Sequence, residues 1–304
     1  MMKTYSDIRE AAKSGVPQVL AVVEAADGEV LKACYEAHVE GIADSILVGV
    51  KADILEAATR VGVPADSFDI VESSSPQESV AKAAGLVREG RAGMLMKGHL
   101  PTGVIMKGVL DKANGLRGSA VLSHTMVAQA DRFGRFLLLS DAGLNPAPDA
   151  DMLAEIIRNS VKVAHCLEIS NPKVACLSAV EAPTEKIPST LLCAEMKRRY
   201  DAGEFSGCAV DGPMALDLAL YPPAIEAKGY GNREVAGFAD ILIVPEITSG
   251  NVLGKSFIYV GGFRCGGIIV GAKVPIVLLS RSDTSETKLD SIALACVYAQ
   301  KHGA

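Results

Sequence analysis

Short apolar runs alternate with amphipathic stretches through the first half of the chain. The apolar runs have the length of buried strands and lie at 17–23, 45–50, 68–71 and 92–96. The stretches between them carry apolar residues at helical spacing and lie at 28–39, 52–61 and 76–88. Ser75, Pro76 and Glu78 form a helix start, with Ser75 as N-cap. Strands and helices that alternate in this way predict an α/β fold with a parallel-rich sheet.

The second half continues the pattern after a loop at 141–148 that is rich in Pro, Gly and Asn. Strands are predicted at 136–139, 174–178, 240–244, 266–270 and 276–279. Helices are predicted at 149–166, 191–200, 214–220 and 285–300. We place a change of domain near the loop. Because no long Gly/Ser linker follows, we expect two lobes that pack around a cleft.

Composition narrows the function classes. The 304 residues are 49% hydrophobic, which excludes a disordered chain, and the net charge of −6 argues against broad nucleic-acid binding. No uninterrupted apolar stretch is long enough to span a membrane, and the N-terminus lacks the apolar region of a signal peptide. The seven Cys form no CxxC pair, so structural zinc and a disulfide framework are not expected. Reduced thiols favour a cytoplasmic location.

Polar residues gather where predicted strands end. Ser280 and Arg281 follow an apolar strand and precede a helix start, where free N–H groups and a guanidinium suit an anion. Capping of the helix by Ser282, Thr284 or Ser285 is the plainer interpretation, and both can hold together.

Two further strand ends carry similar residues. Lys97, Gly98 and Thr102 lie in the segment 96–103, here named the cradle loop because it resembles a phosphate cradle, although it lacks the P-loop pattern. His99 in the same loop is a weaker acid–base candidate, and Lys107 can add charge from the helix that follows. The third strand end carries Ser249, Gly250 and Asn251, where small residues let backbone approach a ligand. Three such strand ends favour one shared polar cleft.

Several other site types find no support. The Gly-containing segments lack the GxGxxG fingerprint, no GxSxG elbow surrounds Ser280, and neither HExxH nor an Asp-rich metal cluster occurs. We therefore predict no metal site and no permanently bound cofactor.

Five segments, in order along the chain, resemble the phosphate acetyl/butyryltransferase family. They are MKGHLPTGVIMKGVL, LLLSDAGLNPAPDADMLAEII, VDGPMALDLAL, ADILIVPEITSGNVLGKS and LLSRSDTSETKLDSIALA. The resemblance is closer to the shorter butyryl branch. It implies a two-lobed fold like that of isocitrate and isopropylmalate dehydrogenases, in which the C-terminal segment completes the first lobe. The expected lobes are residues 1–143 with 278–304, and residues 144–277.

The resemblance also implies a reaction and its partners. An acyl-CoA and inorganic phosphate would give an acyl phosphate and coenzyme A, which is a substrate or product rather than a cofactor. Members of the family are typically homodimers or larger homo-oligomers. We expect no nucleic-acid or membrane partner.

Family residues transfer one position at a time. The Ser-Arg pair of the last strand matches Ser280 and Arg281. Acetyl members have an Asp where this chain has Thr287, so the base is left to Glu286 or Asp283. A family Arg near the cradle loop corresponds to Lys107, and another to Arg117.

The expected mechanism is direct transfer in a ternary complex. Arg281 would hold phosphate or the developing oxyanion, Ser280 would hydrogen-bond the tetrahedral intermediate, and Glu286 or Asp283 would accept the thiol proton. Lys97, Gly98, Thr102, Lys107, Arg117, Ser249, Gly250 and Asn251 are the expected substrate-binding residues. The alternatives are a phosphate acetyltransferase, a non-catalytic protein that binds CoA or phosphate, and a metal-dependent β-decarboxylating dehydrogenase of the same fold.

Overall fold

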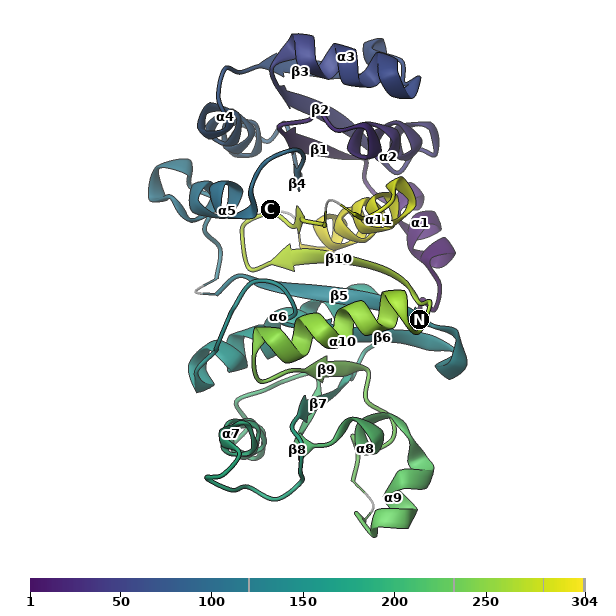
Figure 1. Cartoon of the computed structure of the whole chain (residues 1–304), viewed down its shortest axis with the longest axis vertical. Coiled ribbons are helices and arrows are strands. Elements are labelled where there is room, and N and C mark those ends of the chain that lie inside the picture. The colour runs from purple at the N-terminus through teal and green to yellow at the C-terminus, as the bar shows by residue number, and fades with distance from the viewer. Residues whose placement is uncertain (120, 232, 281, 303–304) are drawn as a thin grey trace. The chain divides into compact units, whose positions relative to one another are not determined.

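The chain divides into two units in the computed structural model, which describes residues 1–119, 121–231, 233–280 and 282–302. The N/C unit consists of Tyr5–Ala120 and Gly266–Ala304, and the middle unit of Met1–Thr4 and Val121–Cys265. Figure 1 labels most of the helices and strands of both units.

The sheet of the N/C unit has the strand order β3-β2-β1-β4-β11-β10. These strands are β1 (Gln18–Val23), β2 (Ala43–Gly49), β3 (Asp69–Glu72), β4 (Met94–Lys97), β10 (Arg264–Val270) and β11 (Ile276–Val277). The pairs from β3 to β11 are parallel, and β10 runs antiparallel to β11.

Helices cover both faces of this sheet (Figure 1). They are α1 (Tyr5–Ser14), α2 (Gly28–Val39), α3 (Lys51–Val61), α4 (Pro76–Arg88), α5 (Thr102–Leu110) and α11 (Ser285–His302), with short 3₁₀ turns η1 (Ala65–Ser67) and η2 (Lys112–Asn114). Helices α4 and α5 pack on one face, and α1, α2, α3 and α11 gather on the other. The predicted start of α4 is confirmed, since the Ser75 hydroxyl accepts a hydrogen bond from the Glu78 N–H at 3.3 Å.

Helix α11 is the core helix of the N/C unit. Every residue from Lys288 to Ala299 is buried, because α1, α2 and the strands β1, β2, β4 and β11 surround it. Its buried Asp290 accepts hydrogen bonds from the Arg9 guanidinium at 2.7 and 3.0 Å. This packing ties the C-terminal segment to the N-terminal half of the chain.

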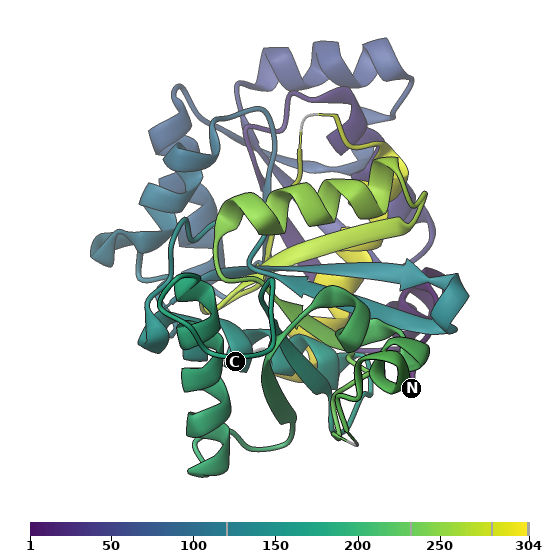
Figure 2. The ribbon, with the colours of Figure 1, turned by 60° about the horizontal axis from the view of Figure 1, so that its bottom comes forward.

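The sheet of the middle unit has the order β5-β6-β9-β7-β8. Its strands are β5 (Ser123–Ala130), β6 (Arg135–Ser140), β7 (Lys173–Leu177), β8 (Ala209–Met214) and β9 (Ile241–Ile243). Strands β5 and β6 form an antiparallel hairpin, drawn in teal in Figure 2, and the other pairs are parallel. The predicted α/β class with a mostly parallel sheet is confirmed.

The helices of the middle unit also lie on both faces of its sheet. They are α6 (Ala150–Cys166), α7 (Pro188–Asp201), α8 (Leu216–Leu220), α9 (Pro222–Lys228) and α10 (Ile247–Tyr259), with the 3₁₀ turn η3 (Asp131–Phe133). Helices α8 and α10 share one buried cluster with inward residues of β5 and β6, and α6 packs on α7.

The limits of the units differ from the predicted lobes because of two hairpins. The β5–β6 hairpin pairs with β9, which draws residues 121–143 into the middle unit. Strands β10 and β11 form the second hairpin, with Ile269 opposite Ile276, and for this reason residues 266–277 belong to the N/C unit.

Candidate active site

Strands β4 and β11 bring two of the predicted motif loops to one edge of the N/C sheet. The strands are parallel, with Leu95 opposite Ile276 and Met96 opposite Val277. Lys97 and Gly98 follow β4, and Ser280 follows β11 after two further residues. Since both strands end at the same level, the cradle loop and the segment before α11 lie at the same edge, where ligands bind in parallel α/β sheets.

The cradle loop begins with a close crossing of two backbones. Gly98 N–H donates to the Val23 carbonyl at 2.8 Å, and His99 N–H donates to the Glu24 carbonyl at 2.7 Å. A Cβ atom at Gly98 would lie 2.1 Å from the Glu24 oxygen. Glycine is therefore needed here because backbone approaches backbone, whatever the loop binds.

The other predicted residues of this loop spread along α5. Lys97 Nζ donates to the Gly98 carbonyl at 3.3 Å, and Thr102 is the first residue of the helix. Lys107 is exposed in the last turn, about 7.5 Å farther along the axis at 1.5 Å per residue. Arg117 Nε donates to the Leu110 carbonyl at 2.5 Å, so its side chain caps the far end of α5. Lys97, Gly98 and Thr102 thus lie at one end of α5, and Arg117 at the other.

Ser280 and Asp283 form a tight turn before α11. Ser280 N–H donates to Asp283 Oδ2 at 2.7 Å, and Asp283 N–H donates to the Ser280 carbonyl at 3.2 Å. The exposed Ser280 hydroxyl lies 3.0 Å from that of Ser282. Arg281, the predicted anion-binding residue, lies outside the described residues.

Protein groups already occupy part of the N-terminus of α11. Ser285 N–H donates to Glu29 Oε2 at 2.8 Å, and Thr287 N–H donates to the Thr284 hydroxyl at 3.3 Å. Hydrogen bonds from Lys32 and from Ser285 lower the pKa of Glu29, which therefore carries its charge at neutral pH. The expected free N–H groups at Ser285 and Thr287 therefore have protein partners. The Thr284 hydroxyl caps Thr287, as the capping interpretation expected, whereas the partner of Ser285 is Glu29, which that interpretation did not name.

The two base candidates differ in their surroundings. One oxygen of the Asp283 carboxylate accepts from the Ser280 backbone, and the side chain is half-buried. Glu286 is exposed in the first turn of α11. Thr287, at the position of the family Asp, has its hydroxyl 3.2 Å from that of Thr284.

In the middle unit, Ser249, Gly250 and Asn251 lie near the start of α10. The Glu246 carboxylate caps this helix by accepting from the Thr248 and Ser249 N–H groups at 2.6 and 2.7 Å. Burial acts to raise the pKa of Glu246, but these hydrogen bonds outweigh it and leave the pKa lowered. The Ser249 hydroxyl donates to the Glu246 carbonyl at 3.0 Å. Both the N–H and the hydroxyl of Ser249 are therefore bonded to Glu246, the cap residue of α10.

Gly250 packs against a loop that Asp141 organises. A Cβ atom at Gly250 would lie 2.9 Å from the Asp141 carbonyl oxygen, and Asn251 Nδ2 lies 3.5 Å from the Ala142 carbonyl. The buried Asp141 carboxylate accepts from the N–H groups of Gly143 and Leu144 at 2.9 and 3.0 Å, and from the Asn145 side chain at 2.5 Å. Asp141, Asn145 and Glu246 are not among the site residues predicted from the sequence. An acidic residue directly after an apolar strand or before a helix is the signal that could have found them.

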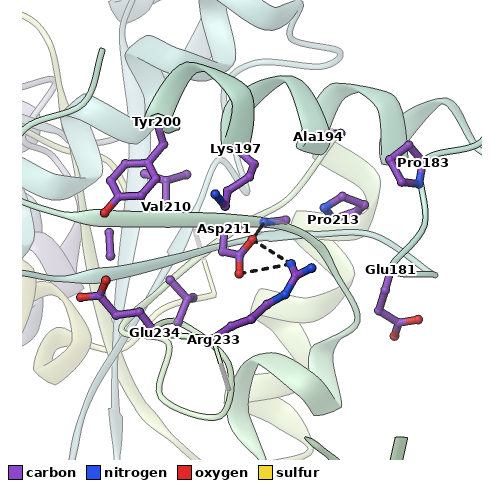
Figure 3. Close-up of a pocket in the computed structure, with 13 residues that line it drawn as sticks. Glu181, Pro183, Ala194, Lys197, Tyr200, Val210, Asp211, Pro213, Arg233 and Glu234 are labelled. Carbon is purple, nitrogen blue, oxygen red and sulfur yellow. Dashed lines mark hydrogen bonds and ion pairs between the residues drawn. The ribbon is translucent and has the colours of Figure 1, made fainter. Parts of the chain in front are cut away.

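A cavity of about 620 Å³ lies in the middle unit between α7, β8 and the segment around Arg233 (Figure 3). Arg233 Nη1 lies 3.2 and 3.4 Å from the two oxygens of the buried Asp211 carboxylate. Lys197 Nζ lies 2.5 and 2.7 Å from the carboxylate of Asp201. Because its cations are paired and none of the predicted site residues lines it, this cavity gives no reason to move the candidate site there.

Within residues 1–119, 121–231, 233–280 and 282–302, no group of three or more His, Cys, Asp or Glu is placed to hold a metal ion. Over the same ranges, no helix combines the length and the hydrophobicity that crossing a membrane needs.

The chain is similar in sequence to known proteins over most of its length. The family model described as phosphate acetyl/butaryl transferase matches residues 74–296. A phosphate butyryltransferase from Clostridium acetobutylicum is 42% identical over 299 residues, which cover 98% of this chain and 99% of the relative. A phosphate acetyltransferase from Rhizobium meliloti is 36% identical over 300 residues, covering 99% and 95%.

A solved structure matches as well. The crystal structure of a branched-chain phosphotransacylase from Enterococcus faecalis V583 superposes with a TM-score of 0.82 at 32% identity and covers 93% of this chain and 99% of that one. The isocitrate dehydrogenase-like fold that the sequence resemblance implied is therefore confirmed.

Proposed function

The chain belongs to the phosphate acetyl/butaryl transferase family, and on that premise we propose that it moves a short acyl group, butyryl or similar, between coenzyme A and inorganic phosphate. The reaction is acyl-CoA plus phosphate giving acyl phosphate plus CoA, and it is reversible. One observation carries the assignment to a site: the cradle loop and the Ser280–Asp283 turn follow neighbouring parallel strands of one sheet.

The transfer is direct, within a ternary complex. A phosphate oxygen attacks the thioester carbonyl carbon, the carbonyl becomes an oxyanion, and the C–S bond then breaks to release the thiolate. Ser280 donates a hydrogen bond to the oxyanion, and Arg281 balances its charge. Binding both substrates together lowers the entropic barrier, so no covalent acyl-enzyme is needed. The roles of Ser280 and Arg281 rest on their match to the family's Ser-Arg pair.

Lys97, Gly98 and Thr102 contact the phosphate or the CoA phosphates at the same sheet edge, with Lys107 and Arg117 farther along α5. Asn251 of α10 contributes through its side-chain amide. The N–H groups of Ser249 and Gly250 already donate to Glu246, which supports a minor part in binding for these two residues. The Ser249 hydroxyl and the Arg117 guanidinium already have backbone partners, which supports a secondary part in binding for both.

In the direction of acyl-CoA synthesis, the CoA thiol proton passes to Glu286 or Asp283. The exposure of Glu286 supports its access to a large substrate, whereas Asp283 spends one carboxylate oxygen on the Ser280 N–H. Glu286→Gln and Asp283→Asn separate the two, because the base variant loses rate and flattens the acidic limb of the pH profile of kcat. Full activity in both variants would remove both residues from this role.

The acyl chain length is tested by thiol release from acetyl-, propionyl-, butyryl- and branched acyl-CoAs with and without phosphate. We expect phosphate-dependent release with the highest kcat/KM for a four- or five-carbon chain. One methylene changes binding by only about 1–3 kcal/mol, so neighbouring chain lengths differ by roughly 10- to 200-fold. A maximum at acetyl-CoA would support the phosphate acetyltransferase alternative, and no phosphate dependence would refute the proposal.

The enzyme acts in the cytoplasm as a homodimer or larger homo-oligomer. In the middle unit, Val252, Tyr259 and Val260 lie on or directly after α10 with 61, 65 and 85% of their surfaces exposed. Their spacing places them on one side of the helix, and such an apolar surface favours association with a second copy. Light scattering should give at least twice the 31.7 kDa chain mass, and Val260→Glu should lower it. A monomeric wild type would contradict this part of the proposal.

A further inference from the structure

Lys288, in the second turn of α11, is the one buried cation among the lysines and arginines that the structure describes. It is 4% exposed, and it belongs to the run of buried residues that forms the core of the N/C unit. Burying an ammonium group is costly unless its donors are satisfied. None of the ion pairs formed by the described residues includes Lys288. The hydrogen bonds of the Lys288 ammonium group should therefore explain why it is buried.

The ammonium group binds the turn that follows β11. Lys288 Nζ donates a hydrogen bond to the Asp283 carbonyl. Asp283 in turn accepts from the Ser280 N–H through its carboxylate at 2.7 Å and donates to the Ser280 carbonyl at 3.2 Å. Three hydrogen bonds therefore connect a core lysine to the backbone of Ser280.

The helix that carries Lys288 is itself fixed to the sheet. The Ser291 hydroxyl donates to the Thr287 carbonyl at 2.9 Å and accepts from the Gly267 N–H of β10 at 3.0 Å. The Lys288 N–H also donates to the Thr284 carbonyl at 3.1 Å. A buried side chain on a fixed helix is a better anchor for a turn than an exposed one, because it has lost its rotamer freedom on folding.

We propose that Lys288 is a positioning residue for acyl transfer, which holds the Ser280–Asp283 turn in the geometry that the transfer step uses. The inference rests on the proposed function for the role of Ser280. Its physical basis is that a charge-assisted hydrogen bond to the Asp283 carbonyl is stronger than a neutral one and fixes one end of the turn. The Ser280 hydroxyl can stabilise an oxyanion only if its backbone is held in place before substrates bind.

The test compares Lys288→Met, which keeps the side-chain length without the charge, with Lys82→Met as a matched control. Lys82 lies on α4 in the same unit, and its Nζ also donates to a backbone carbonyl, that of Glu72 at 2.6 Å. Two readouts are combined: hydrogen exchange of the Ser280 amide in the enzyme without substrates, and kcat and KM for phosphate and butyryl-CoA.

In Lys288→Met, we expect the Ser280 amide to exchange about 10-fold faster or more, the factor that loss of a charge-assisted hydrogen bond gives. We expect kcat per folded molecule to fall by about the same factor, with both KM values nearly unchanged, because the turn acts on the transfer step. Lys82→Met should match the wild type in every readout. If Lys288→Met does not fold, Lys288→Gln, which keeps a donor without the charge, takes its place with the same expectations.

An unchanged Ser280 exchange rate would overturn the proposal, and so would faster exchange with an unchanged kcat. A fall in activity that tracks only the loss of folded protein would also overturn it, since a purely structural lysine gives that result. A wild type without phosphate-dependent transfer would refute the proposed function. The exchange measurement would then still report whether Lys288 holds the turn.

Discussion

Gly98 offers the sharpest test of how the candidate site is built. In Gly98→Ala the new Cβ atom would lie 2.1 Å from the Glu24 oxygen and 2.8 Å from the Val23 oxygen, both backbone atoms. An ordinary contact begins near 3.4 Å, so the backbones must separate by more than 1 Å. That movement strains the Gly98–Val23 and His99–Glu24 hydrogen bonds, which join the ends of β4 and β1.

The cost follows from these contacts. Overpacking costs about 1–3 kcal/mol, and a rigid backbone neighbour favours the upper end of that range. Two weakened hydrogen bonds add about 1 kcal/mol in total. We therefore expect a loss of about 3–4 kcal/mol from the N/C unit, which lowers the apparent Tm by about 5–10 °C in a chain of this size.

Gly103→Ala is the matched control. Gly103 lies in the first turn of α5, and no atom lies within 4 Å of a Cβ built there. Alanine stabilises a helix by up to about 1 kcal/mol relative to glycine, so the apparent Tm should stay or rise. Thermal unfolding and phosphate-dependent thiol release measure both variants. Equal Tm and equal turnover in Gly98→Ala and the wild type would refute the close crossing of the two backbones.

Three further results are expected. Glu246→Ala should lower the free energy of unfolding in urea by about 1 kcal/mol, because α10 loses its cap. The folded pKa of Glu246 lies below its usual 4.5, so the cap stabilises fully above pH 4.5 and weakens as pH falls through the folded pKa. Equal losses at pH 7 and pH 3 would show that the charge of Glu246 does not matter. Asp290→Ala should cost about 1–3 kcal/mol, because Arg9 loses two hydrogen bonds to a buried carboxylate but keeps its ion pair with Glu40, and a neutral result would disprove the pairing with Asp290. All seven cysteines are buried, and burial raises the pKa of Cys193 and Cys296 to about 12, so a thiol reagent should detect no enzyme thiol before unfolding and seven after it.

The sequence predicted elements wherever local patterns agreed with packing. The start of α4 at Ser75 and Pro76 is one example, because its cap uses only neighbouring residues. Strand β5 was missed, since its inward positions include Ser123 and Thr125. Asn159 Nδ2 of α6 donates to the Ser123 hydroxyl at 3.0 Å, which gives that polar atom a partner only in the folded chain. Hydrophobic periodicity carries no signal for such a strand.

Some features of the candidate site could likewise be predicted from the sequence, and others could not. Strand order and register explain why Lys97, Gly98 and Ser280 gather at one sheet edge, which sequence could predict from strand ends. The use of Glu29 and Glu246 as helix caps and the burial of Lys288 could not be predicted, because each depends on contacts between distant segments or on the direction of one side chain.

The decisive measurement is phosphate-dependent release of CoA thiol from butyryl-CoA by Arg281→Ala. If Arg281 stabilises the transition state of acyl transfer, turnover falls about 100-fold or more, the loss expected when a preorganised charge is removed, while the apparent Tm stays at the wild-type value. A folded Arg281→Ala enzyme with wild-type turnover would show that Arg281 has no part in the transfer.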